Sequence, residues 1–83
     1  MRDSSAFTPV PRRRLSDQLV ERILASIATG ELRPGDQLPS ILETARRFDV
    51  GASTVREALI RLEAKGVIEI RHGAGVFVVA SAA

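Results

Sequence analysis

"GASTVREALIRLEAKG", residues 51–66, is the stretch that decides the predicted fold. Its apolar residues recur at helical spacing and form one stripe: Val55, Ala58, Leu59 and Leu62. The other face is polar; it begins with the small residues Ala52, Ser53 and Thr54 and continues with Arg56. This pattern predicts a helix, about residues 52–65, that packs on a core and presents a cation to a partner.

Composition limits the class of protein. The 83 residues suffice for one small domain, and 45% hydrophobic with 27% charged residues fits a globular chain. The sequence has no cysteine, so a disulfide scaffold and a thiolate metal site are excluded, and a cytoplasmic location is expected. No apolar run is long enough to span a membrane. The net charge is only +2, but arginine greatly outnumbers lysine and the sequence pI is about 10.4, which points mildly to a polyanionic partner.

The chain upstream of residue 51 shows two further helical patterns. Residues 1–14 read as a flexible basic leader that ends in three arginines, and a helical periodicity starts at Leu15. Gly30 is expected to cap the end of that helix, and "LRPGDQLPS" (32–40) reads as a turn followed by an extended piece. Ser40 and Glu43 form a capping-box pattern that opens a short helix through about Phe48.

Downstream of Gly66 the pattern changes to strands. "VIEIR" (67–71) and "VFVVA" (76–80) flank "HGAG", which predicts two short strands joined by a glycine-rich hairpin. The fold class is therefore mainly α with a small hairpin: a winged helix-turn-helix of three helices and a two- to three-stranded antiparallel wing. Residues 15–79 form this domain, and residues 80–83 are a tail or the start of a linker.

This arrangement suits double-stranded DNA. The second helix of such a motif can enter a major groove about 12 Å wide, leading with its N-terminal residues. A wing tip at residues 72–75, reduced to glycine and alanine after His72, would allow the backbone to approach a phosphate or the minor groove. The three arginines at 12–14 are either a solubilising tail or an accessory arm on phosphate or the minor groove.

From Leu15 to Val79 the chain resembles the N-terminal winged-helix domain of GntR-family bacterial transcription regulators. The resemblance rests on "GELRPGDQLPS" (30–40), "TVREALIRLEAKGVIEIR" (54–71) and "HGAGVFV" (72–78). It implies a homodimeric repressor or activator on a palindromic double-stranded operator. It also implies a C-terminal effector or dimerisation domain, before which this chain stops.

The sequence departs from the family pattern at two places. "SILETA" (40–45) stands where Ser-Glu-Arg-Glu-Leu-Ala is usual, so Leu42 replaces an arginine that commonly contacts DNA and Thr44 replaces a core leucine. "GAST" (51–54) stands for Ser-Arg-Thr-Thr, so Ala52 occupies the place of a base-reading arginine. Leu42 and Ala52 would either touch a thymine methyl or face solvent.

Nine residues form the expected DNA-contacting set: Ser40, Leu42, Ala52, Ser53, Thr54, Arg56, His72, Gly73 and Gly75. Ser53 and Thr54 could instead cap their helix, and Arg56 could be a solvated surface arginine. No cofactor, catalytic residue or metal site is expected: the chain has one histidine, and no nucleophile has a base partner. The alternative function is a winged-helix module that binds another protein with little DNA specificity.

Overall fold

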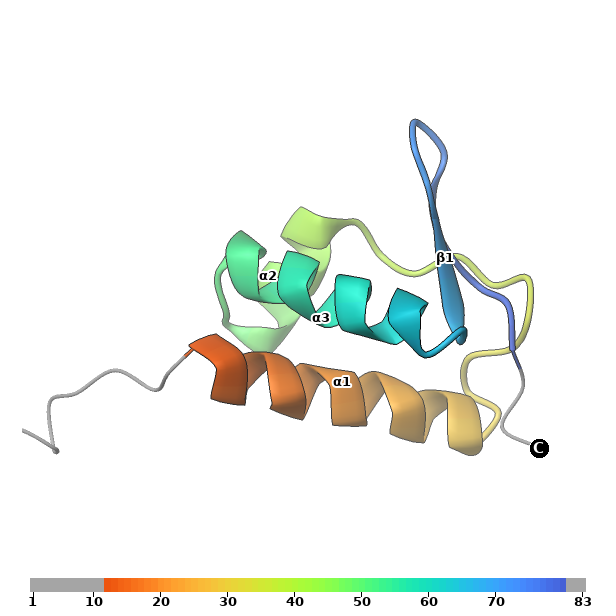
Figure 1. Cartoon of the computed structure of the whole chain (residues 1–83), viewed down its shortest axis with the longest axis horizontal. Coiled ribbons are helices and arrows are strands. Elements are labelled where there is room, and N and C mark those ends of the chain that lie inside the picture. Colours follow the sequence, from red (N-terminus) through yellow and green to blue (C-terminus); the bar gives the residue numbers. More distant parts are fainter. Residues whose placement is uncertain (1–11, 81–83) are drawn as a thin grey trace, which may run out of the picture.

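The structure is a computed structural model that describes residues 12–80 (Figure 1). It holds five elements: α1 (Arg12–Ala28), α2 (Ile41–Phe48), α3 (Ala52–Ala64), β1 (Ile68–Arg71) and β2 (Gly75–Val78). The leader proposed for residues 1–14 lies outside the described residues up to residue 11, as do residues 81–83 of the proposed tail.

Helix α1 begins three residues earlier than the periodicity indicates. Its first turn contains the three arginines assigned to the leader, and the side chains of Arg13 and Arg14 are exposed. Apolar periodicity cannot detect a helix start made of arginines, because the pattern registers only apolar side chains. At the other end Gly30 has a φ of 81°, and its amide donates to the Ile27 carbonyl. The predicted glycine cap is thus confirmed.

The segment after α1 turns back along the hairpin. In the turn at residues 33–36 the Asp36 amide donates to the Arg33 carbonyl, and Gly35 takes the positive φ, 94°, that the third position of a type II turn requires. The chain then runs antiparallel to β2, with a bridge between Gln37 and Phe77. The wing therefore consists of two strands and a bridged third segment.

Helices α2 and α3 are joined by residues 49–51. Ser40 caps α2, since its hydroxyl accepts a hydrogen bond from the Glu43 amide at 3.1 Å. Asp49 ends the helix in the left-handed conformation, with φ of 55°, and its amide donates back to the helix. Gly51 then caps α3 without a side-chain hydrogen bond. The short link fixes the relative direction of the two helices.

The core lies between α1 and α3 and extends to the base of the hairpin. Its buried apolar residues are Leu19, Val20, Ile23, Ile27, Leu38, Val55, Ala58, Leu59, Leu62, Ile68 and Val78. Phe48 is only partly buried, and the guanidinium of Arg22 lies 5.2 Å from its ring centroid. Burying this apolar surface is what holds α3 in place.

The hairpin follows α3 directly. Strands β1 and β2 are antiparallel, with Ile68 opposite Val78 and Arg71 opposite Gly75. Figure 1 shows the hairpin rising from the C-terminal end of α3, on the side away from α1. Three helices and a small antiparallel wing in this order are the predicted winged helix-turn-helix, and the fold class is confirmed.

Candidate nucleic-acid interface

The exposed face of α3 carries one cation near its middle. Ser53 and Arg56 are exposed, and Ala52 is half-buried in the first turn. Among residues 12–80 no carboxylate lies within ion-pair distance of Arg56, whereas Arg46, Arg47, Arg61 and Arg71 all have such partners. Arg56 is therefore available to a phosphate or a base edge.

Thr54 does not belong to this face. Thr54 is 4% exposed and lies among the buried residues of α3, and the expected contact of its hydroxyl with DNA stays a prediction. Thr54 is four residues before Ala58 and therefore lies on the apolar stripe of the helix. The burial of Thr54 could therefore be inferred from helical spacing, but a residue with a hydroxyl group is not counted in an apolar pattern.

A partly buried polar cluster joins α3 to α1. Ser16 is fully buried, and its hydroxyl lies 2.8 Å from a carboxylate oxygen of Glu57 and accepts from Arg61 Nη1 at 3.1 Å. Arg61 also forms an ion pair with Asp17. Since Glu57 is next to Arg56, the cluster sets the rotation of α3 and thereby the direction of its exposed face. The partners are more than forty residues apart (41 and 45), which is why the sequence did not reveal them.

The wing tip is shaped by glycine and by Gln37. The Ala74 amide donates to the Arg71 carbonyl, and Gly73, at the third position of that turn, has a φ of 80°. Gly75 has a φ of 128°, and a Cβ built there would overlap the side-chain nitrogen of Gln37. That nitrogen donates to the Ala74 carbonyl at 3.1 Å. Gln37, which was not among the predicted residues, thus braces the tip.

A groove lies between α3 and the wing. It has a volume of about 440 Å³, and eight residues line it: Ile41, Arg56, Leu59, Ile60, Glu63, Ile70, His72 and Val76. Arg56 was predicted from the helix and His72 from the hairpin, and both residues line this groove. The lining is mostly apolar, and Glu63 is engaged there by the Ile70 amide, which donates to its carboxylate at 3.0 Å.

Helix α2 contributes a capping serine and an exposed leucine. Ser40 is exposed, but its hydroxyl is already engaged in capping α2. Leu42 is 74% exposed, so its side chain faces solvent in the free chain. Thr44, at the position expected for a core leucine, is buried and lies 3.4 Å from the Pro39 carbonyl.

Glu43 forms the main charged contact on α2. Hydrogen bonds from Arg46 first, and then from Arg47 at 2.9 Å, hold the pKa of the Glu43 carboxyl below its ordinary value. Both arginines are largely exposed, so the contact adds little to stability. It pairs the two exposed guanidinium groups with a carboxylate of their own helix.

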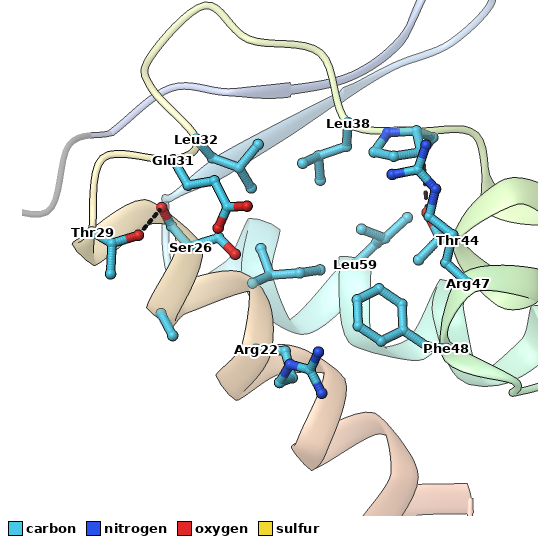
Figure 2. A pocket seen from close by; sticks show the side chains of 13 residues that line it. Arg22, Ser26, Thr29, Glu31, Leu32, Leu38, Thr44, Arg47, Phe48 and Leu59 are labelled. Atoms are coloured by element: carbon cyan, nitrogen blue, oxygen red, sulfur yellow. Dashed lines mark hydrogen bonds between the residues drawn. The ribbon is translucent and has the colours of Figure 1, made fainter.

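A second cavity, of about 410 Å³, lies between α1, the 29–39 segment and α2. Figure 2 shows Phe48 and Leu59 lining it from α2 and α3, and Arg22 beside Phe48. None of the nine predicted residues lines this cavity. The candidate residues gather instead on the exposed face of α3, at the start of α2 and on the wing.

Residues 12–80 lack two other classes of site. No group of three or more histidine, cysteine, aspartate or glutamate side chains in this range could hold a metal ion. No helix in the same range is both long and apolar enough to cross a membrane.

Comparison with known sequences places these features in a wider group. The sequence model of the bacterial regulatory proteins, gntR family, matches residues 15–78. The chain is 43% identical over 68 residues to the HTH-type transcriptional regulator Mce2R of Mycobacterium tuberculosis, covering 82% of this chain and 28% of that protein. It is 42% identical over 65 residues to the HTH-type transcriptional repressor NanR of an Enterobacter species, covering 78% of this chain and 25% of the repressor. The chain thus spans 28% or less of these two relatives.

Solved structures have the same fold. A GntR family transcriptional regulator from Listeria monocytogenes matches with a TM-score of 0.76 and 29% identity, over 94% of this chain and 62% of that chain. The crystal structure of AraR(DBD) in complex with operator ORE1 matches with a TM-score of 0.76 and 28% identity, over 86% of this chain and 83% of that chain.

Proposed function

Because the chain belongs to the GntR family of bacterial regulatory proteins, we propose that it is an operator-reading domain that binds double-stranded DNA sequence-specifically. Helix α3 lies in the major groove and leads with its N-terminal residues, and the wing tip at residues 72–75 lies on the flanking backbone or minor groove. The contacts come from Ser53, Arg56, His72 and the glycine backbone of the tip, while Ala52 and Leu42 offer only apolar surface.

One observation carries the proposal. Arg56 is exposed, has no ion-pair partner within residues 12–80, and lines the same groove as His72. A charge-assisted hydrogen bond to phosphate, or a bidentate bond to guanine, is what such a guanidinium favours. The AraR structure supports the proposal of DNA binding, because a domain of this fold was crystallised there with an operator.

Two copies would bind a palindrome. Operator-binding helix-turn-helix proteins place two recognition helices one helical turn of DNA apart, about 34–36 Å, so protein symmetry is mirrored in the site. A single copy makes only half of these contacts. The two copies are held together on DNA or through a C-terminal effector domain of a longer protein, and the second copy gains by avidity.

The test is a titration of fluorescent duplex DNA with the chain over a range of salt concentrations. Phosphate contacts release counterions, so affinity should fall steeply as salt rises. Binding that is absent, or that does not change with salt while the chain is folded, would refute the proposal.

The alternative, a winged-helix module that binds protein, has one observation in its favour. Leu42 and Ile60 are large, apolar and exposed, at 74% and 61%, where a DNA reader would ordinarily present polar groups. The salt titration separates the two functions, because an apolar protein contact depends weakly on salt.

A further inference from the structure

Ile60 is an exposed isoleucine on the proposed reading face of α3. Its side chain is 61% exposed, although it lies in the interior of a 13-residue helix whose other large apolar side chains are buried. A single exposed apolar residue is ordinary on a protein surface. Ile60 stands out because of the groove that it lines.

The position of Ile60 relative to Arg56 places both on one surface. Four residues along a helix correspond to about one turn, so Ile60 lies on the same face, roughly 6 Å further along the axis. Both side chains line the groove between α3 and the wing, together with Ile70 and Val76. A cation and an apolar group therefore face the same partner.

The chemistry of duplex DNA provides one match for that pair. Every base edge in the major groove presents hydrogen-bond donors or acceptors, and only thymine adds an apolar group, its C5-methyl. A phosphate or an amino group held against Ile60 would lose water without gaining a partner. Arg56 takes the polar or charged group, and Ile60 requires an apolar one.

We propose that Ile60 is a specificity-determining residue that packs against the methyl group of a thymine in the operator, beside the contact made by Arg56. This inference rests on the proposed function, and it names a base that the site prefers. It also explains how a recognition helix without arginine at Ala52 still distinguishes sequences: part of its readout is apolar.

The experiment removes the methyl group alone. A duplex selected by this chain from a random-sequence pool is remade with deoxyuridine in place of each thymidine in turn. Binding is measured for the unaltered chain and for Ile60→Ala, Leu42→Ala and Val79→Ala. Uracil keeps every hydrogen-bonding group of thymine, so only apolar contact is lost. Val79 is also exposed, at 45%, and is absent from the groove, which makes its truncation the matched control.

For the unaltered chain and Val79→Ala we expect deoxyuridine at one position per half-site to weaken binding about fourfold, the value of one buried methyl group. For Ile60→Ala the same replacement should change nothing, since the contact is already gone. The variant should fold, because alanine at an exposed helix position raises helix propensity.

The inference is overturned if no deoxyuridine weakens binding, or if the penalty persists in Ile60→Ala. A penalty that disappears in Leu42→Ala instead assigns the methyl contact to α2 and also overturns it. In all three cases specific duplex binding remains and the proposed function stands. If no duplex is selected by the folded chain, both proposals fail together.

Discussion

Arg56 and Thr54 show how burial separates two polar residues on different faces of one helix. Both are polar and lie within one turn of each other, but Thr54 packs into the core while Arg56 is exposed and unpaired among the residues described. Only the second can interact with a partner without disturbing the fold. The residue-scale predictions therefore concern exposed positions on α3.

Replacing Arg56 by alanine should weaken duplex binding by about 1–3 kcal/mol, because a phosphate or base-edge contact is lost. The slope of log affinity against log salt should fall by about 1 if the contact is to phosphate. The fold should persist, since Arg56 is off the apolar stripe. Fluorescence anisotropy titrations measure both quantities.

Arg22→Ala is the matched control for that experiment. It removes an equal charge from the cavity between α1 and α2, where none of the candidate residues lies, and should leave DNA binding much less affected. Wild-type affinity in a folded Arg56→Ala variant would contradict the assignment of Arg56 to the interface.

Ala52→Arg should tighten binding and add a preference for guanine at one position of the half-site. Ala52 is half-buried in the first turn of α3, where side chains reach base edges, and its methyl group cannot make the bidentate bond that arginine makes to guanine. Selection from random duplex DNA with both chains measures the shift. The prediction is contradicted if the unaltered chain already selects a guanine whose replacement costs ~1–3 kcal/mol and Ala52→Arg leaves that preference unchanged. In that case residue 52 does not contact the base.

At the scale of elements, the wing is the part whose shape depends most on glycine. Gly73 and Gly75 both have positive φ, and Gln37 of the neighbouring segment braces the tip through the Ala74 carbonyl. The tip is exposed and lies away from α1, so its conformation and the stability of the core can change independently (Figure 1).

Gly75→Val should therefore weaken DNA binding more than it lowers the melting temperature. A branched side chain is strained at a φ of 128°, and its Cβ would displace the Gln37 side chain from the Ala74 carbonyl. Anisotropy and thermal unfolding are compared with Gly51→Ala, a position without positive φ and with open space for a Cβ. Unchanged binding together with a large loss of stability would mean that the wing is purely structural.

The contact between Glu43 and its two arginines predicts that the free energy of unfolding depends on pH. The Glu43 pKa is lowered in the folded chain, first by Arg46 and then by Arg47, so its contribution to stability is present above the unfolded pKa. This contribution to stability is lost as pH falls through the pKa that Glu43 has in the folded chain. The difference in free energy of unfolding between the wild type and Glu43→Gln should shrink from about pH 7 to about pH 3 in urea titrations. A difference that grows on acidification would contradict this contact.

Local signals accounted for most of the elements. Gly30, the Ser40 cap and the apolar stripe of α3 each act within about one helical turn, and each was visible in the sequence. The Ser16 cluster and the Gln37 brace join residues 37 to 45 positions apart, and no local pattern encodes them. At the candidate site, Arg56 and His72 could be predicted, but the groove that unites them required the fold.

At the scale of the whole molecule, the helix that supports α3 lies apart from the surface proposed to recognise DNA. Helix α1 packs along α3 and orients it through the core and the Ser16 cluster, while the hairpin projects on the side away from α1 (Figure 1). No residue of α1 lines the groove between α3 and the wing. The chain spans about a quarter of its regulator relatives, such as 28% of Mce2R.

Selection of binding sites from random duplex DNA tests the central claim most directly. The folded chain is incubated with the pool, bound duplexes are amplified, and the enriched sequences are aligned over several rounds. We predict one common half-site, recovered as an inverted repeat with centres about one helical turn apart. Its affinity should exceed that of a shuffled duplex by roughly 10³-fold or more when two copies bind. No enrichment over the starting pool, from a chain shown to be folded, would contradict the claim that α3 and the wing read DNA.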